Sequence, residues 1–299
     1  MDISVIVPTY NRSRQLKLCL QALCVQSFPA DSFEIIVVDD GSRDNTRGIA
    51  EYFTGRNKIK YIYQKNKGCS AARNAGIKQA TGNILAFIDD DIIAPPFWLD
   101  NIMTAFKNNV NFHIIQGPCH YRKSSGPLLE AMQYLSSFAD RLRIIESPDF
   151  YEGKEAVYIG TGNLAIKRDI VFQHGLFFDE ILRRRQDEDY YRVVQQLGIK
   201  VGFIPNSALH DCHLSLAADF DRFFNYGKGE YYLQKKWGHF IRIPYKIKVT
   251  KIIRELGLWR GVIIKIIIEI RWVYWGLGFL YEKFKDYGTK VKKPSDDSS

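Results

Sequence analysis

Three consecutive carboxylates, Asp89-Asp90-Asp91, directly follow the apolar run 84–88, which is typical of a buried strand. Like charges repel at a strand end, and removing each of them from water is costly. Such a run is tolerated when a cation lies among the carboxylates, and Mg²⁺ and Mn²⁺ prefer oxygen ligands. The alternative is a solvated acidic turn before Pro95-Pro96. A second apolar run, 35–38, also ends in acids at Asp39-Asp40, and two acidic strand ends favour the cation site.

Short apolar runs alternate with helical patterns from residue 3 to about residue 115. We expect strands at 3–7, 34–38, 60–63 and 84–88 and helices at 14–25, 46–53 and 70–80. Buried strands that are separated by helices form a mostly parallel sheet of βαβ units, an α/β fold. Ligands of such sheets bind beyond the carboxyl ends of the strands. Both acidic runs are therefore expected to face one site.

The middle of the chain is less regular. We expect a helix at 128–145, a strand at 164–166, a helix at 187–197 and a strand at 200–204. A glycine-rich turn, Gly160-Thr161-Gly162-Asn163, precedes the first of these strands. The last eight residues, 292–299, are polar and charged, which predicts a disordered tail.

A broad apolar stripe runs through residues 249–281. Its members alternate at three- and four-residue spacing: Leu256, Trp259, Ile263, Ile266, Ile270, Val273, Leu277 and Leu280. Charged residues interrupt the stripe, so we expect no membrane-spanning helix. Basic flanks and tryptophans are typical of helices that lie in a membrane interface. The alternatives are a helix packed on the body of the protein and a coiled coil between copies, hence a homo-oligomer.

The net charge of +9 is unevenly distributed. Residues 235–293 contain 15 Lys or Arg and 4 Asp or Glu, whereas the remainder contains 27 basic and 29 acidic residues. This distribution favours an anionic membrane surface as a partner. A nucleic-acid enzyme would spread its positive charge along a binding groove, and the C-terminal stripe is mostly aliphatic. We therefore expect no nucleic-acid partner.

The five cysteines, at positions 19, 24, 69, 119 and 212, are an odd number without a CxxC pair. They predict thiols in a reducing compartment and neither a disulfide framework nor a zinc site. No signal peptide is visible, because Met1-Asp2 leads straight into the first strand. We expect a cytoplasmic protein that is peripheral on the inner face of the plasma membrane. A chain of 299 residues allows one large domain, or a domain with an appendage.

Two further motifs each allow two interpretations. Asp39-Asp40-Gly41-Ser42 could hold a ligand or could cap the next helix. The segment 67–76 opens a helix of small residues, which serves either close helix–sheet packing or the approach of backbone to a phosphate, with Arg73 supplying charge. The segment is neither a Walker loop nor a GxGxxG motif, which argues against a dehydrogenase.

Taken together and in this order, the motifs resemble family 2 of the nucleotide-sugar glycosyltransferases over about residues 3–240. They are PTYNR (8–12), VVDDGS (37–42), NKGCSAARNAGI (66–77), the triple Asp (89–91), GTGNLAIKRD (160–169) and the acidic motif RQDEDYY (185–191). The resemblance implies the GT-A fold and sugar transfer with inversion. It implies a GT-A domain over 1–240, with a nucleotide-binding half to about residue 115 and an acceptor half over 116–240. From the apolar stripe and the charge distribution we expect a basic amphipathic helical region over 241–291.

The resemblance also implies residue roles on the donor side. The donor-binding residues would be Pro8, Thr9, Tyr10, Arg12, Asp39, Gly68, Arg73 and Asp90. Thr9 and Asp39 would contact the nucleoside, and Arg73 and Asp90 the ribose or the diphosphate. Asp91, with Asp89, would hold Mn²⁺ or Mg²⁺. A histidine after Pro205, either His210 or His213, is a further candidate for the metal or phosphate, and the spacing does not decide between them.

On the acceptor side the resemblance makes Asp187 the general base. Gly162, Asn163 and Gln186 would lie beside it. The family usually has Glu where this chain has Gln186, a departure that leaves the base intact. The expected partners are a nucleotide-sugar donor and a glycan or lipid-linked acceptor. UDP-sugars are the commonest donors in the family, so a UDP-sugar is expected, in cell-wall or polysaccharide biosynthesis.

Processive members of the family carry a Gln-x-x-Arg-Trp signature and several spanning helices. Here the nearest match is Gln234-Lys235-Lys236-Trp237, with Lys in place of Arg. We therefore expect the addition of a single sugar rather than polymerisation. The other alternative is a non-catalytic nucleotide-sugar-binding protein on a membrane, against which the triple Asp and Asp187 both argue.

Overall fold

A computed structural model describes residues 1–54, 58–121, 159–204, 206, 208–211, 215–238 and 258–291. The chain divides into two units. The first contains Met1–Lys123, Ser136–Ile181 and Gln186–Cys212, and the second contains Ser124–Leu135, Leu182–Arg185 and His213–Ser299. The predicted helix at 128–145, the predicted tail at 292–299, Cys212 and His213 lie outside the described residues. The predicted domain limits at 115, 240 and 291 stay predictions.

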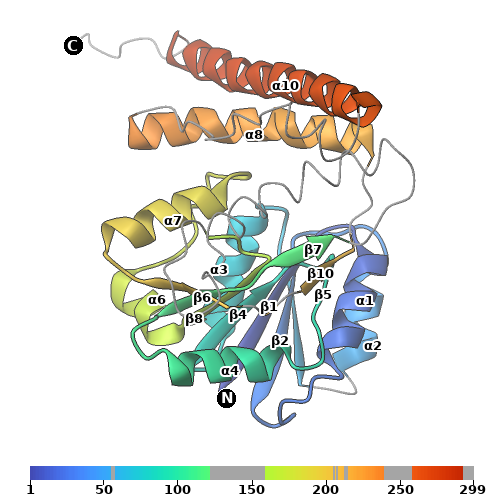
Figure 1. Ribbon diagram of the computed structural model, residues 1–299, viewed down its shortest axis with the longest axis vertical. Helices are drawn as coiled ribbons and strands as arrows, with labels where there is room; N and C mark the ends of the chain where they lie inside the picture. Colours follow the sequence, from blue (N-terminus) through green and yellow to red (C-terminus); the bar gives the residue numbers. More distant parts are fainter. Residues whose placement is uncertain are drawn as a thin grey trace, which may run out of the picture. The chain divides into compact units, whose positions relative to one another are not determined.

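A seven-stranded sheet runs through the first unit in the order β3-β2-β1-β4-β8-β6-β9 (Figure 1). Its strands are β1 (Ile3–Thr9), β2 (Phe33–Asp39), β3 (Ile59–Tyr63), β4 (Ile84–Ile88), β6 (Ile114–Gln116), β8 (Asn163–Lys167) and β9 (Val201–Phe203). The pairs within β1–β4 and the pair β6–β9 are parallel, and β8 runs antiparallel to β4 and β6. The predicted mostly parallel α/β sheet is confirmed.

Helices cover both faces of this sheet. They are α1 (Ser13–Leu23), α2 (Thr46–Thr54), α3 (Cys69–Gln79), α4 (Trp98–Asn108), α6 (Arg168–His174) and α7 (Gln186–Gln196). Buried side chains of α1, α2 and α4 share one hydrophobic cluster, and those of α3, α6 and α7 share another. The first unit therefore has three layers, with the sheet between two layers of helices.

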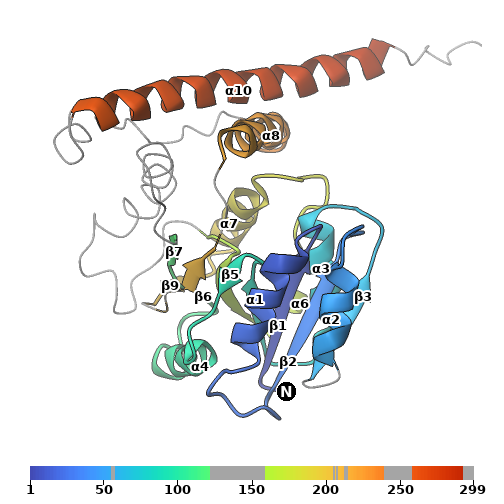
Figure 2. The same cartoon turned by 90° about the vertical axis from the view of Figure 1, so that its right-hand side faces the viewer.

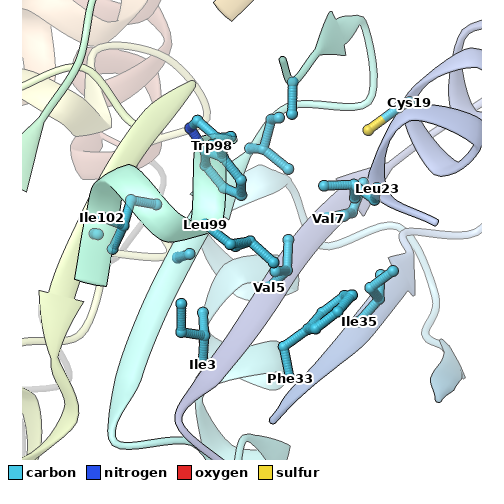
Figure 3. Packing of buried hydrophobic residues seen from close by; sticks show 14 of the residues in the cluster. Ile3, Val5, Val7, Cys19, Leu23, Phe33, Ile35, Trp98, Leu99 and Ile102 are labelled. Atoms are coloured by element: carbon cyan, nitrogen blue, oxygen red, sulfur yellow. The ribbon is translucent and has the colours of Figure 1, made fainter. Parts of the chain in front are cut away.

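The central strands are apolar on both faces because each face meets a helical layer. In β1, Val5 and Val7 belong to the cluster under α1 and α4, whereas Ile6 belongs to the opposite cluster. Figure 3 shows Val5 and Val7 packed with Leu23 and Leu99. A side-chain period of two with burial on both sides produces the continuous apolar runs that are visible in the sequence.

The elements predicted in the first unit on described residues are present, with ends that differ by at most two residues. The prediction omitted α4, α6, α8 (Leu216–Trp237), β6 and a small sheet of three strands, β5 (Ile92–Ile93), β10 (Ala208–His210) and β7 (Cys119–Tyr121). Strands of two or three residues are too short to show an alternating pattern. No disulfide joins the cysteines within the described part of the chain.

The second unit contains two long helices, α8 (Leu216–Trp237) and α10 (Leu258–Val291), which confirms a helix over the described part of 249–281. They run in the same direction, because Phe220 stacks on Tyr274 at 5.0 Å while Tyr231, further along α8, donates to Asp286 over 2.7 Å. Helices α8 and α10 cross each other (Figure 2). They approach closely at glycines, because a side chain at Gly278 would collide with the Phe224 carbonyl of α8. In the regions that the structure describes, neither of these helices nor any other is apolar over a sufficient length to cross a bilayer.

A half-buried carboxylate ties β1 and β2 to the turn before β4. Glu34 in β2 accepts hydrogen bonds from the Ser4 hydroxyl and from both the amide and the hydroxyl of Thr81, each over 2.7 Å. Burial opposes ionisation, but these hydrogen bonds prevail and lower the pKa of Glu34. A carboxyl whose pKa is lower in the folded than in the unfolded protein stabilises the fold at pH values above its unfolded-state pKa. This stabilisation is lost as the pH falls through the folded-state pKa.

We expect Glu34→Gln to reduce the free energy of unfolding by about 1–2 kcal/mol at pH 7, because an ionised acceptor is lost. The difference should shrink as the pH falls through the lowered pKa of Glu34, because the side chain is then protonated in the folded protein as well. Urea unfolding at pH 7 and pH 3 measures both values. Glu51→Gln, which breaks only the exposed ion pair with Arg47, is the control and should cost less than about 0.5 kcal/mol. An equal loss for Glu34→Gln at both pH values would contradict the account.

Candidate functional site

The acidic residues gather at one edge of the sheet, where β1, β2 and β4 end. Thr9 at the end of β1 pairs in register with Asp39 at the end of β2. Asp89 follows directly after β4, the other neighbour of β1. Parallel strands bring their carboxyl ends to the same edge, and the two predicted acidic runs therefore lie at one place.

Asp39 and Asp40 organise the loops at this edge. Asp39 accepts hydrogen bonds from the Ser42 amide and the Tyr61 hydroxyl, both over 2.8 Å. Asp40 accepts from the amides of Lys67 and Gly68, also over 2.8 Å each. Asp40 thereby fixes the loop that opens α3, in which Gly68 has a φ of 100°, a conformation that favours glycine. The nucleoside contact predicted for Asp39 stays a prediction.

Asp90 is buried beneath the end of β1. It accepts a hydrogen bond from the Thr9 hydroxyl over 2.8 Å and one from Arg12 over 3.0 Å. Burial raises the pKa of Asp90 to about 7, against the opposing effects of Arg12 and Thr9. The role of Arg12 as a partner of the acidic run was not predicted.

Asp91 lies between two cationic groups. One carboxylate oxygen is 2.7 Å from Arg12, and the other is 3.1 Å from Nε2 of His210. Burial disfavours ionisation of Asp91, but the hydrogen bond and charge of His210, together with Arg12, lower the pKa of Asp91. In turn, Asp91 outweighs the effect of burial on the imidazole and raises the pKa of His210.

The small sheet brings His210 to this position. His210 in β10 pairs with Ile92 in β5, directly after the acidic run, and the Asp211 amide donates to the Asp91 carbonyl over 2.7 Å. Of the two histidines that the sequence left open, His210 therefore lies beside Asp91. His213 lies outside the described residues.

Asp89 and Asp187 share a second cation, Arg73 of α3. Arg73 is 2% exposed and donates to Asp89 over 2.7 Å. Asp187, in the first turn of α7, accepts from the Thr161 hydroxyl over 2.8 Å. Burial raises the pKa of Asp187; the positive charge of Arg73 opposes this effect and the negative charge of Asp89 adds to it. Asp187, nearly 100 residues further along the chain, therefore belongs to the same cluster as Asp89.

Arg73 has unused donors. Within the described residues, its Nε and Nη1 atoms are buried without a hydrogen-bond acceptor. A buried guanidinium is expected to satisfy its donors, and a ligand with several acceptor oxygens would do so. Gly162 lies next to this group, because a side chain there would be 3.3 Å from a carboxylate oxygen of Asp89.

Asn163 lies beneath the site and is 3% exposed. Its side chain accepts from the Trp98 indole over 2.8 Å and donates to the carbonyls of Pro118 and Asn206 over 3.0 and 2.6 Å. These bonds join α4, β8 and the segment before β10, so Asn163 holds together the elements around the site. Its predicted acceptor-side role stays a prediction.

The remaining predicted residues differ in exposure. Pro8 is buried in β1, whereas Tyr10 is 45% exposed. Gln186 begins α7, and its Oε1 is buried without a partner in the part of the chain that is described. The contact of Thr161 with Asp187 was not predicted, although the glycine-rich turn that contains Thr161 was. The sequence analysis missed Tyr61, for which the sequence carried no signal.

The residues around Asp91 offer a partial metal site. No group of three or more His, Cys, Asp or Glu side chains is arranged around a common point in the described residues. The pair Asp91–His210 does present a carboxylate oxygen and an imidazole nitrogen side by side. Mn²⁺ and Mg²⁺ bind few protein groups when phosphate oxygens complete their coordination, so the pair fits a cation that binds together with a diphosphate. The metal role of these residues stays a prediction.

Proteins with known names resemble this chain in sequence. It is 32% identical over 138 residues to validoxylamine A glucosyltransferase of Streptomyces hygroscopicus subsp. jinggangensis, covering 46% of this chain and 33% of that protein. It is 34% identical over 149 residues to chondroitin synthase of Escherichia coli, covering 49% of this chain and 21% of that protein. The chain thus matches about a third or less of the length of these relatives.

Solved structures share the fold. The mannosyltransferase PcManGT from Pyrobaculum calidifontis, solved with GDP-Man and Mn²⁺, has a TM-score of 0.61 at 18% identity, over 98% of this chain and 81% of that one. S. aureus TarS 1–349 in complex with UDP-GlcNAc has a TM-score of 0.55 at 16% identity, over 96% and 92%. These similarities confirm the predicted GT-A fold.

The sequence pattern of one family covers most of the first unit. The family described as glycosyl transferase family 2 matches residues 4–173, which is more than half of the chain and includes five of the six motifs named above. The sixth, at 185–191, carries Asp187 and lies in the same structural cluster as Asp89. The chain belongs to glycosyl transferase family 2.

Proposed function

We propose that the protein is an inverting, metal-dependent glycosyltransferase. It would move one sugar from a nucleotide-sugar donor, with UDP-sugars as the first candidates, to a hydroxyl of a lipid-linked or cell-surface glycan acceptor. The observation that carries this proposal is the meeting of Asp187 and Asp89 around the buried Arg73. Asp91 and His210 extend this cluster, because the charge of Asp89 also acts on His210.

Asp187 is suited to act as the general base. A positioned carboxylate accelerates such a step by roughly 10²- to 10⁴-fold, and a pKa raised toward neutrality makes it a better proton acceptor. The bond from C1 of the sugar to the phosphate oxygen breaks as the bond from the acceptor oxygen to C1 forms on the opposite face. The acceptor proton moves to Asp187, and the nucleoside diphosphate leaves with the electron pair.

Arg73 and the residues around Asp91 are suited to hold the diphosphate. The unpaired donors of Arg73 can bind phosphate oxygens. Asp91 and His210, with Asp89 nearby, would hold the ion. A bound Mn²⁺ or Mg²⁺ supplies positive charge that stabilises the leaving diphosphate. Arg12 and His210 both pair with Asp91. Because the Arg12 side chain is 46% exposed, it can turn toward solvent when a cation binds to Asp91.

The related structures support a nucleotide-sugar donor without fixing the base. TarS was solved with UDP and with UDP-GlcNAc, and PcManGT with GDP-Man. Single-sugar transfer is favoured over processive synthesis because, with Trp237 aligned, Leu233 and Lys236 stand where the processive signature has Gln and Arg. A non-catalytic binding protein is the other candidate, and the partly buried Asp187 beside Arg73 argues against it.

An exposed face of α10 supports the proposed location on the inner face of a membrane. Apolar residues, all more than a third exposed, recur along it at helical spacing: Trp259, Val262, Ile266, Val273, Leu277, Leu280, Phe284 and Tyr287. We call them the α10 stripe. Exposed lysines on the same helix, Lys265, Lys283 and Lys285, can reach lipid phosphates while their stems lie on apolar surface.

Asp187→Asn should lower the turnover number for sugar transfer by at least 10²-fold, because the proton acceptor is lost. Donor binding should persist within about twofold. Release of UDP from UDP-glucose, UDP-GlcNAc and UDP-galactose, and of GDP from GDP-mannose, measures turnover with water as acceptor. Asp169→Asn, which removes an exposed carboxylate in the same unit, is the control. Near-normal turnover in Asp187→Asn would refute the base assignment.

Asp91→Ala and His210→Ala should each abolish the part of nucleotide binding that depends on Mn²⁺, because both remove a proposed ligand. Thermal shift with UDP, GDP and dTDP, each with Mn²⁺, Mg²⁺ or EDTA, identifies the base and the metal together. His174→Ala, an exposed histidine at the end of α6, is the matched control. The metal assignment fails if the variants keep the metal-dependent shift of the wild-type protein.

The double variant Leu277→Glu/Phe284→Glu should reduce binding to vesicles of phosphatidylglycerol and phosphatidylcholine by more than about tenfold, since burial of each side chain contributes roughly 1.5–3 kcal/mol. Vesicle co-sedimentation measures this. Val110→Glu, at an exposed apolar residue outside α10, is the control and should bind normally. Equal vesicle binding by the wild type, the double variant and Val110→Glu would contradict the proposal that α10 binds a membrane. A wild-type dimer that the double variant converts to monomer would favour the homo-oligomer instead.

A further inference from the structure

One residue beside the proposed base has an unusual backbone conformation. Among the described residues, only Asn11 and Arg185 combine a side chain with a positive φ, at 52° and 62°. Residues with a Cβ rarely adopt this conformation, and where it persists the surrounding structure must hold it. Arg185 stands two positions before Asp187.

Helix α8 holds this segment through two adjacent residues. The guanidinium of Arg185 donates to the carboxylate of Glu230, and the two side chains are 8% and 0% exposed. At the preceding position of α8, a side chain on Gly229 would be 2.7 Å from the carbonyl of Arg184. The close approach and the ion pair together fix the backbone of 184–185 within the second unit.

The chain leaves the second unit at Arg185 and enters α7, in the first unit, at Gln186. Asp187 is the second residue of α7, so the backbone torsions of Arg185 set the direction in which its helical turn begins. We propose that Glu230 is a positioning residue: its buried ion pair with Arg185 holds the left-handed backbone that orients Asp187. This inference rests on the proposed function, because it requires Asp187 to be the base.

The same helix offers a matched control. Asp219, also in α8 and 1% exposed at its side chain, forms a buried ion pair with Arg271 of α10 at 2.7 and 3.0 Å. Losing either carboxylate removes the negative charge that compensates a buried arginine, so both losses should destabilise the protein. Of these two carboxylates, only Glu230 pairs with a residue, Arg185, that directly precedes the helical turn carrying Asp187.

The first experiment compares Glu230→Gln with Asp219→Asn in the full-length protein. The readouts are the turnover and KM for release of UDP or GDP from the four nucleotide sugars named above, the Kd for UDP with Mn²⁺, and the melting temperature. We expect both variants to melt at a lower temperature. Glu230→Gln should lose at least tenfold in turnover with donor KM and UDP affinity unchanged, whereas Asp219→Asn should keep turnover within twofold.

The second experiment separates backbone geometry from charge. In the background of Glu230→Gln, position 185 is changed to Gly or to Ala. Glycine adopts a positive φ without strain and alanine does not. We expect Arg185→Gly to restore turnover to within about threefold of wild type, whereas Arg185→Ala stays at least tenfold below it.

Two outcomes overturn the inference: equal turnover losses in Glu230→Gln and Asp219→Asn, or equal turnover in the Gly and Ala double variants. Asp187→Asn, measured in parallel, separates this failure from failure of the proposed function. If Asp187→Asn is inactive while either outcome is found, only the role of Glu230 is lost. If Asp187→Asn is active, the base assignment fails, and the role of Glu230 fails with it.

Discussion

The burial of several carboxylates at one edge of the sheet is the constraint on which the site depends. Asp90 and Asp91 are almost completely buried, and Asp89 and Asp187 act on the same buried arginine. Such charges are tolerated only because cations lie among them. Arg12, Arg73 and His210 supply that compensation, and each comes from a different part of the chain.

This balance of charge also explains how the site can exchange partners. Arg12 is half-exposed and binds two carboxylates, so a divalent ion can replace it without leaving a carboxylate uncompensated. Arg73 is fully buried and cannot leave, but it retains unused donors for an anion. In the proposed function, Arg12 would give way to a divalent cation and Arg73 would bind a phosphate of the nucleotide-sugar donor.

The sequence predicted the sheet well because its strands are buried on both faces and end in charged residues. The same pattern located the acidic runs at one edge. The small sheet β5-β10-β7 could not be predicted, since two- and three-residue strands have no visible period, and this sheet decides which histidine lies beside Asp91. The contact of Glu230 with Arg185 was equally invisible, because 45 residues separate partners that no local pattern connects. The roles of the site residues stay predictions.

The central claim is that the acidic edge of the sheet holds a divalent cation together with a nucleoside diphosphate. Anomalous diffraction at the manganese edge, from crystals grown with Mn²⁺ and UDP, tests it most directly. The account predicts one strong peak within ligating distance of Asp91 and His210, with a UDP phosphate oxygen on the same ion and Arg12 released from Asp91. Bound UDP with no manganese beside Asp91, or a manganese peak at another part of the protein, would contradict it.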